Sequence, residues 1–504
     1  MKQFLLFLAA CLLPLSVVAE VRLPKIFADG MVLQQRQKVR LWGWCDRLAT
    51  VVTSWDNRSY TATPDTDGRF DIAVETPQAG GPYSITFNET TGDGNTQHST
   101  LNSQHSTLNA QRSTLNAQRS TLSIQCYIGE VWLCSGQSNM EMLMKGYKGQ
   151  PVENAAEELL QCGDSLLRLF YVERVATLTP QRDVTGTWRA ADADAVRNFS
   201  ATAYFFGRAL RRTLGVPVGL ICTAFGGSAC EAWMKPEWLK PFCAPYSSPV
   251  SGYTVALPNG EDDVKRLQQR CPTALYNGQL SPLVGYGIRG AIWYQGEDNV
   301  PRYDFYAPLL KAMVEGWRSE WQQGDFPFYY CQIAPFDYSA TDWAKYNSAL
   351  LREQQQKAES MIANARMAVL MDTGIKNVIH PRKKRQAGER LALLALANTY
   401  DVKGLPDFAV YSSVEFKGDT AVVAFDRSRE WVYFEHCQRS SNFELAGDDR
   451  VFHPAEAWVS RNRVYVCSHE VKHPVAVRYA FHDWAVGDLM HDGLPVSSFR
   501  SDNW

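Results

Sequence analysis

A short apolar run and a polar turn stand side by side in Gly129-Glu-Val-Trp-Leu-Cys-Ser-Gly-Gln-Ser-Asn-Met-Glu-Met142. Residues 128–134 are mostly apolar and include Val131 and Trp132, which favour extended backbone, so we expect a buried strand there. The polar residues that follow form a turn, after which a helix can begin. This order places Ser138 at the carboxyl end of a strand, where open α/β sheets bind ligands. The alternative is an ordinary junction whose turn residues are polar.

Apolar strands alternate with helical segments between residues 125 and 400. Five strands are predicted, at residues 128–134, 218–224, 288–294, 327–333 and 367–372. Helical periodicity is found at residues 200–214, with Gly215 as C-cap, and at 303–321. This alternation predicts an α/β domain with a five-stranded parallel sheet that is covered by helices on both faces.

Residues that could take part in catalysis follow four of these strands. They are Ser138 after the first strand, Gly226-Gly227 after the second, Gln295 after the third and His380 after the fifth. The carboxyl ends of parallel strands meet at one edge of a sheet, so we expect these groups to lie together. Such a set performs acyl transfer, with a serine nucleophile, a histidine base and N–H donors for the oxyanion. The backbone N–H groups of Ser138 and Gly226 and the side chain of Gln295 are the predicted donors.

Histidine placement narrows the choice of base. The chain has nine histidines, and His380 is the only one between residues 125 and 400. An α/β domain that uses its own imidazole base therefore has one choice. The alternative is a loop histidine without a role.

The composition and net charge of the chain bear on which partners to expect. The chain has 504 residues and a formal net charge of −2, which gives no reason to expect nucleic acid or an anionic membrane as partner. Fifteen Trp and 22 Tyr are many for this length, and carbohydrate-binding clefts use flat aromatic faces. These features weakly favour a glycan as partner.

Residues 1–19 resemble a secretory signal peptide, because Lys2 precedes an apolar run that ends in small residues. Cys11 lies in a lipoprotein-like box, but the apolar run continues past it, so simple export to the periplasm or the medium is preferred. No later window is long and apolar enough to predict a membrane span. The other eleven cysteines show neither a disulfide framework nor metal-ligand spacing. Two pairs, Cys222 with Cys230 and Cys437 with Cys467, could still form disulfides.

The flanking regions differ from the α/β part. Residues 20–95 contain short strands separated by turns, which predicts a small sandwich or jelly roll. Residues 96–124 carry a seven-residue repeat with one leucine per unit, whereas a coiled coil needs two apolar residues per seven. These residues are predicted to be a low-complexity loop. Residues 401–504 return to short strands and form a second β-rich region.

Several long blocks resemble the sialate O-acetylesterase family of SGNH (GDSL-like) hydrolases. Besides residues 129–142, they comprise residues 23–34, 226–234, 275–278, 293–299, 380–384 and 493–500. The resemblance implies an SGNH-like three-layer domain and a secreted carbohydrate O-acetylesterase that uses neither metal nor cofactor. It also implies that Ser138 is the nucleophile, His380 the base, and Gly226 and Gln295 the oxyanion donors, with Gly227 as the alternative glycine.

One position departs from the SGNH pattern. These hydrolases usually carry an aspartate three residues before the histidine, where this chain has Asn377. Asparagine cannot supply the charge that stabilises an imidazolium. The acid is either missing, which leaves a Ser–His pair, or supplied by Asp372 or Glu297.

The leading hypothesis is an esterase that removes acetyl groups from sugar hydroxyls, with 9-O-acetyl sialic acid as substrate. Acetyl esters of plant polysaccharides such as xylan are the second substrate class. A non-catalytic carbohydrate-binding protein on a degenerate hydrolase frame is the alternative from another functional class. The absence of a G-x-S-x-G motif speaks against a lipase or a peptidase. The sequence does not indicate an oligomeric state.

Overall fold

The computed structural model of the chain describes residues 21–90, 121–342, 347–428 and 431–504. Its backbone contacts divide the chain into two compact units. The smaller unit has Leu41–Val74 and the described parts of Ser84–Ile124 as its main segments. The larger unit contains Pro24–Arg40, Glu75–Tyr83 and the described parts of Gln125–Trp504. The predicted signal peptide and most of the predicted repeat lie outside the described residues.

Short antiparallel strands build the smaller unit. They are β3 (Leu48–Thr53), β4 (Ser59–Ala62), β5 (Arg69–Glu75) and parts of β2 (Lys38–Trp44) and β6 (Gly80–Thr90). Strand β3 pairs with β4 and β6, and β2 pairs with β5. Every second residue of β5 is buried, as expected for a strand with one face on a core. Strand β5 is one of the short strands expected within residues 20–95.

Strands β6 and β7 (Thr121–Gly136) are paired neighbours on either side of residues 91–120. The Thr121 hydroxyl donates to Oδ1 of Asn88 at 2.8 Å, which fixes one strand end against the other. The predicted loop at residues 96–124 is thus too long at its carboxyl end. Residues 121–124 belong to β7, because a paired strand satisfies their backbone groups.

The main sheet of the larger unit has the strand order β13-β12-β11-β7-β10-β8-β9. Besides β7, its strands are β8 (Asp164–Tyr171), β9 (Trp188–Ala191), β10 (Val218–Ala224), β11 (Gly290–Tyr294), β12 (Phe328–Cys331) and β13 (Ala365–Ala368). All five predicted strands are present, but the five-stranded parallel sheet is not. Strand β8 adds a sixth parallel strand, and β9 pairs with β8 antiparallel, so the sheet is mixed. Strand β1 (Met31–Gln34) also pairs with β7.

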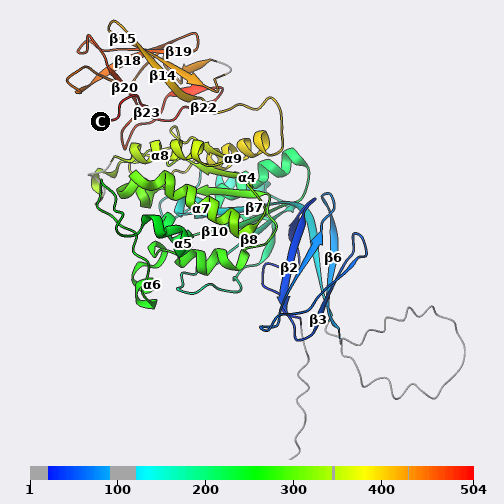
Figure 1. Ribbon diagram of the computed structural model, residues 1–504. Coiled ribbons are helices and arrows are strands. Elements are labelled where there is room, and N and C mark those ends of the chain that lie inside the picture. Colours follow the sequence, from blue (N-terminus) through cyan, green and yellow to red (C-terminus); the bar gives the residue numbers. More distant parts are fainter. Residues whose placement is uncertain (1–20, 91–120, 343–346, 429–430) are drawn as a thin grey trace, which may run out of the picture. The chain divides into compact units, whose positions relative to one another are not determined.

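The order of the strands reverses beside β7. From β7 the chain builds β8 and β10 on one side and then β11, β12 and β13 on the other. Figure 1 labels β7, β10 and β8 of this sheet. Open α/β sheets bind ligands at the carboxyl end of the strands where this reversal occurs. Ser138 follows β7 at that point.

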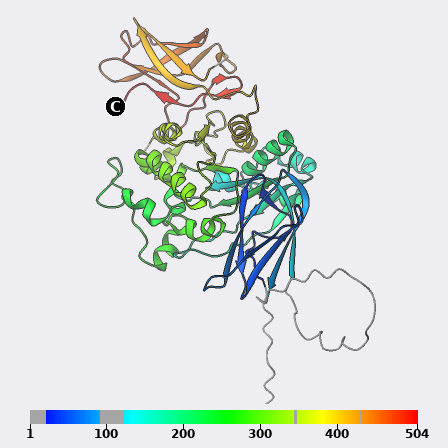
Figure 2. The ribbon, with the colours of Figure 1, turned by 45° about the vertical axis from the view of Figure 1, so that its right-hand side comes forward.

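Helices cover both faces of this sheet. The longer ones are α4 (Ala201–Leu214), α7 (Tyr306–Trp321), α8 (Ser348–Met361) and α9 (Lys384–Asn398). The shorter ones are α1 (Ser138–Glu141), α2 (Ala155–Gln161), α3 (Ala193–Arg197), α5 (Pro236–Leu239) and α6 (Glu261–Leu267). Helix α4 packs on α9, and α7 packs on α8 (Figure 2).

Two tryptophans show which helix lies on which face. Trp132 on β7 meets Phe206 of α4 edge-on at 5.1 Å, and Trp293 on β11 meets Trp317 of α7 at 5.7 Å. Trp132 is in register with Gly290, three residues before Trp293, so the two indoles point to opposite faces. Helices α4 and α7 therefore lie on opposite sides, as predicted.

The predicted helix at residues 200–214 is confirmed as α4. The Ser200 hydroxyl accepts from the N–H of Ala203 at 3.0 Å, and Gly215 ends the helix with φ +69°. The helix predicted at 303–321 begins later, at Tyr306. Tight 3₁₀ turns that contain Pro301 occupy residues 297–305.

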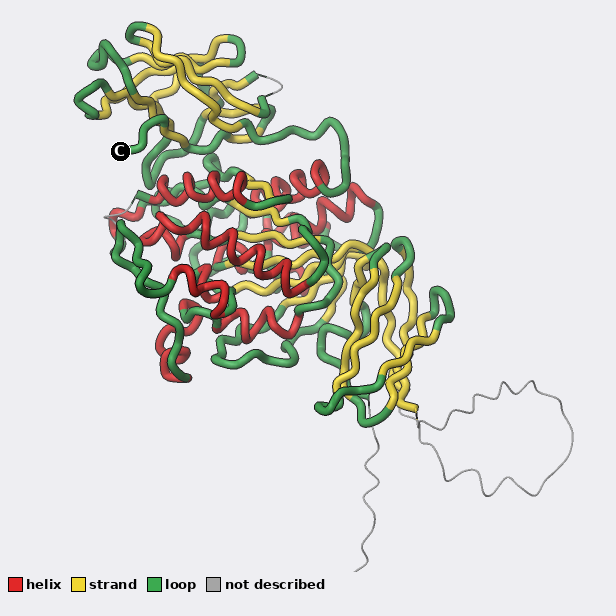
Figure 3. Tube along the Cα trace, viewed as in Figure 1, coloured by secondary structure: helices red, strands yellow, loops and turns green. Residues whose placement is uncertain are grey.

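The carboxyl-terminal region is built of strands, as predicted (Figure 3). Seven antiparallel strands form the sheet β14-β15-β19-β18-β17-β20-β23, and β16, β21 and β22 form a smaller sheet. Their bounds are β14 (Val410–Lys417), β15 (Thr420–Asp426), β16 (Val432–Phe434), β17 (Arg439–Ala446), β18 (Phe452–Ser460), β19 (Arg463–Cys467), β20 (Ala476–Tyr479), β21 (Leu489–His491), β22 (Leu494–Pro495) and β23 (Phe499–Arg500).

The eleven cysteines of the described residues are all free. Neither Cys222 with Cys230 nor Cys437 with Cys467 forms the disulfide that the sequence left open. Among the described helices, none has the length and apolar character that a membrane span requires.

Candidate active site

Ser138 is the first residue of α1 and lies half-buried at the carboxyl end of β7. The turn before it depends on Gly136, which has φ +142°. A Cβ atom at this position would lie 2.2 Å from the carbonyl oxygen of Tyr294, so only glycine fits. The Ser138 N–H begins the helix and has no hydrogen-bond partner within the described residues. It is available to an oxyanion.

His380 lines the same cavity as Ser138, which has a volume of about 460 Å³. Its Nδ1 lies 2.7 Å from Oε1 of Gln150, and its ring meets Tyr147 edge-on at 5.0 Å. An amide oxygen only accepts hydrogen bonds, so Nδ1 carries the proton. The lone pair is then on Nε2, which is the tautomer that a general base needs.

None of the three residues considered for the orienting role holds the ring. Asn377 is exposed, and Asp372 forms a two-pronged ion pair with Arg390 at 2.6 Å on each oxygen. Glu297 lines the cavity, but its Oε1 accepts from the side chain of Asn139 at 2.5 Å. A neutral residue, Gln150, therefore holds His380 where an SGNH hydrolase usually has a carboxylate.

The environment of His380 disfavours its charged form. Burial, followed by the nearby Lys384 ammonium, lowers the pKa of His380 to about 4. No carboxylate within hydrogen-bonding distance counteracts these effects in the described structure. The imidazole is consequently neutral, and able to accept a proton, over a wide pH range.

Two of the three predicted oxyanion donors, Gly226 and Gln295, already have hydrogen-bond partners. Gly226 lines the cavity, but its N–H donates to Oε2 of Glu141 at 2.9 Å. Gln295 is fully buried away from the cavity, and its amide donates to the Ser228 carbonyl and to Oδ1 of Asn299. The predicted role of Gln295 is therefore not supported by this geometry, because both of its N–H groups are already bonded.

Gly227 fits the role of the second donor better than Gly226. It lines the cavity with φ +71°, and its N–H has no partner among the described residues. Gln137 contributes a further donor group. This residue lines the cavity; its Oε1 accepts from the N–H of Gly296 at 3.2 Å, and its Nε2 has no partner in the described part of the chain.

A buried polar chain lies behind the nucleophile. Asn139 donates to Glu297, and Lys384 donates to Oδ1 of Asn139 at 2.5 Å. Burial raises the pKa of Glu297 and lowers the pKa of Lys384 to about 7. These two hydrogen bonds hold the side chain of Asn139, the residue after Ser138, from both sides.

Some residues of the cavity were missed by the sequence analysis. They are Glu141, Tyr147, Gln150, Arg174 and Arg270. Glu141 gave a usable signal, since it is a charged residue between two methionines. Gln150 gave none, because it reaches His380 across 230 positions of the chain.

Comparison with known proteins identifies the family. The family model described as "Carbohydrate esterase, sialic acid-specific acetylesterase" matches residues 128–396, more than half of the chain. The chain belongs to this family of carbohydrate esterases. It is therefore a carboxylic ester hydrolase, and the family resemblance predicted from the sequence blocks is confirmed.

Individual relatives agree with the family. The chain is 26% identical to mouse sialate O-acetylesterase over 74% of its own length and 73% of that protein. It is 29% identical to the human enzyme over 55% of its own length, and that match spans 54% of the human protein. A solved carbohydrate acetylesterase from Xanthomonas citri is 31% identical, with a TM-score of 0.79, and covers 96% of this chain and 100% of that one. This esterase of the same fold supports the α/β architecture described above.

Proposed function

We propose that this esterase removes acetyl groups from sugar hydroxyls, with 9-O-acetyl sialic acid as its substrate. The observation that carries the proposal is that Ser138 and His380 line one cavity with the Nδ1 of His380 held by Gln150. The family match supports the acetyl group and the carbohydrate. The names of the mammalian relatives support sialic acid as the sugar.

The reaction follows from the placement of these groups. The hydroxyl of Ser138 attacks the acetyl carbonyl carbon while Nε2 of His380 takes its proton. The N–H groups of Ser138 and Gly227 stabilise the oxyanion. The proton passes from His380 to the departing sugar oxygen, and an acetyl group remains on Ser138. Water, deprotonated by His380, then releases acetate.

Two further parts of the proposal rest on the sequence. The signal-peptide-like residues 1–19 support export of the enzyme to the periplasm or the medium. The second substrate class expected from the sequence resemblance is the acetyl esters of plant polysaccharides such as xylan, and the Xanthomonas citri relative, a carbohydrate acetylesterase, is compatible with it.

Release of acetate tests the proposal. The enzyme should hydrolyse a chromogenic acetyl ester much faster than the butyryl ester, and should release acetate from 9-O-acetyl sialic acid. Ser138→Ala should reduce both activities at least about a thousandfold with an unchanged melting curve. A variant that keeps more than a percent or so of the rate would exclude Ser138 as nucleophile. Faster release from acetylated xylan than from the sialic acid would favour the neutral substrate.

A further inference from the structure

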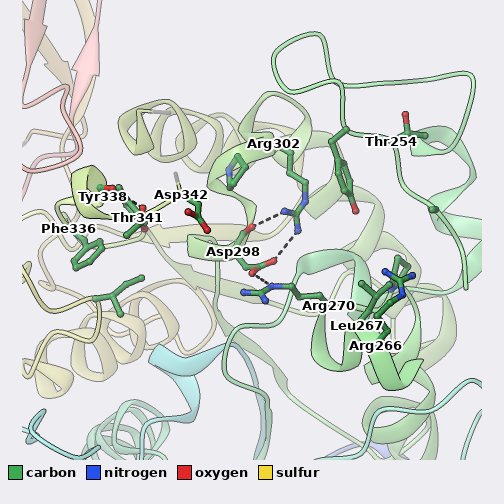
Figure 4. Close-up of a pocket in the computed structure, with 15 residues that line it drawn as sticks. Thr254, Arg266, Leu267, Arg270, Asp298, Arg302, Phe336, Tyr338, Thr341 and Asp342 are labelled. Carbon is green, nitrogen blue, oxygen red and sulfur yellow. Dashed lines mark hydrogen bonds and ion pairs between the residues drawn. The ribbon is translucent and has the colours of Figure 1, made fainter. Parts of the chain in front are cut away.

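A second cavity of about 800 Å³ lies next to the catalytic one and shares part of its wall. The shared residues are Arg270, Asp298 and Ile379. Phe336 and Tyr253 also line it, and Figure 4 shows Arg270, Asp298 and Arg302 joined to one another among the lining residues. An acetylated sugar whose ester reaches Ser138 therefore has room for its remaining atoms beside Arg270.

Arg270 is fixed by a buried carboxylate. Its Nε donates to Oδ1 of Asp298 at 2.6 Å, and the side chain of Asp298 is only 3% exposed. The other oxygen of Asp298 accepts from Arg302 at 3.1 Å, and Arg302 is held in turn by Glu231 at 2.7 Å (Figure 4). Asp298 thus keeps a partner, and a defined position, without Arg270.

The outer end of Arg270 is available to a ligand. Its side chain is 53% exposed, and neither of its Nη groups has a hydrogen-bond partner among the described residues. A Cβ atom on Gly227 would lie 3.9 Å from Nη2 of Arg270, and one on Gly226 would lie 3.4 Å from Cβ of Ser138. The unpaired end of the guanidinium therefore lies beside the loop that borders the nucleophile.

Arg174 repeats this arrangement on the wall of the catalytic cavity. Its Nε donates to Oε1 of Glu141 at 2.5 Å; its side chain is 49% exposed, and that of Glu141 is 2% exposed. In both pairs the carboxylate is buried and the cation faces the cavity. The catalytic cavity is therefore lined by two half-exposed guanidinium groups, although the protein as a whole has a net charge of −2.

We propose that Arg270, supported by Arg174, forms an anion subsite that binds the carboxylate of an acidic sugar while the acetyl ester of that sugar lies at Ser138. A guanidinium anchored through Nε still presents its two Nη groups, whose planar geometry matches a carboxylate. The inference rests on the proposed function and assigns its selectivity to particular residues. A neutral sugar would leave the Nη groups of Arg270 without a charged partner.

The decisive experiment compares 9-O-acetyl sialic acid with its methyl ester, which lacks the charge and keeps the sugar and the acetyl group. The wild-type enzyme should prefer the free acid, through a lower KM. Arg270→Gln should lower the ratio of kcat/KM for acid over methyl ester at least about tenfold, and Arg270→Lys should restore part of it. Arg266→Gln is the matched control, because Arg266 lines only the outer cavity and donates to Asp263 at 2.7 Å. It should leave the ratio near the wild-type value.

The inference would be overturned if Arg270→Gln, with a normal melting curve, had the same acid-to-methyl-ester ratio of kcat/KM as the wild-type enzyme. If the wild-type enzyme does not hydrolyse the sialic acid ester at all, the proposed substrate fails, and the subsite is tested by inhibition instead. Free sialic acid should then inhibit hydrolysis of the chromogenic acetyl ester competitively in the wild type and at least about tenfold more weakly in Arg270→Gln. Equal inhibition, or none in the wild type, would reject the subsite.

Discussion

The side chain of Asn139, the residue after the candidate nucleophile, donates a hydrogen bond of 3.1 Å to the carbonyl oxygen of Ile379, the residue before the candidate base. The same amide donates to Glu297 and accepts from Lys384. Asn139 is 1% exposed, so these bonds are shielded from water. One buried amide thus links the segments that carry Ser138 and His380.

Replacement of Asn139 should lower kcat by more than the loss of stability alone explains. Asn139→Ala leaves Lys384 and Glu297 buried without their partner, so we expect a loss of about 1–3 kcal/mol in the free energy of unfolding. Misalignment of Ser138 and His380 should lower kcat about a hundredfold, measured on the acetyl ester at a temperature where the variant is folded. A rate within a factor of about two of wild type would show that the link does not position the pair.

The low pKa of His380 predicts activity in acid. The base must be neutral, and its pKa of about 4 keeps it neutral well below the pH at which an ordinary histidine is protonated. We expect kcat/KM for the acetyl ester to be nearly constant from pH 7 to about pH 5 and to fall to half near pH 4. A half-maximal value between about pH 6 and 7 would contradict the environment described here.

Gln150 should control both the orientation and the titration of His380. Gln150→Leu removes the acceptor of Nδ1 and should lower kcat about a hundredfold. Gln150→Glu puts a carboxylate next to the ring and should raise the acid limb of the pH profile by about one unit or more, since an opposite charge favours the imidazolium.

Asn377→Asp is the matched control for these variants. Residue 377 is exposed, and no hydrogen bond connects it to His380 in the described structure, so the rate should stay within about threefold of wild type. A hundredfold gain would mean that residue 377 reaches the ring and that Gln150 is not its main partner.

Deletion of Gln97 to Ala117 should leave activity and melting temperature nearly unchanged. Strands β6 and β7 are paired on either side of this segment, and loop length affects stability only logarithmically. Thermal unfolding and acetyl ester hydrolysis of the deleted protein are the measurements. A drop of many degrees would show that the repeat packs on the folded protein.

The sequence predicted five strands of the main sheet correctly but not the full number of its strands. The five predicted strands lie in apolar runs, and burial on both faces leaves that signature. Strand β8 was missed because it begins with two polar residues, Asp164 and Ser165, and Arg168 interrupts its apolar run; β9 was missed because it has only four residues. Ser138, Gly226 and His380 were expected to lie together because each follows a strand in the chain order, and all three line one cavity.

The partners of these residues could not be found in the same way. Gln150 and Arg270 reach the cavity only in the folded protein, and no local sequence pattern around either residue predicts that position. Gln295 shows the reverse error. It stands directly after a strand, but the backbone after β11 turns inward, so that its amide satisfies Ser228 and Asn299 inside the protein. Position after a strand indicates the correct edge of the sheet, but not which way a side chain points.

The pairing of β6 with β7 has a consequence for the gene. Each unit of the repeat is encoded by a whole number of codons, so slippage during replication that adds or removes a unit preserves the reading frame. Such a change alters the length of chain between Thr90 and Thr121 but not the register of the two strands, which the Thr121–Asn88 contact and the sheet fix. A change in the number of repeat units therefore leaves the residues around Ser138 in place.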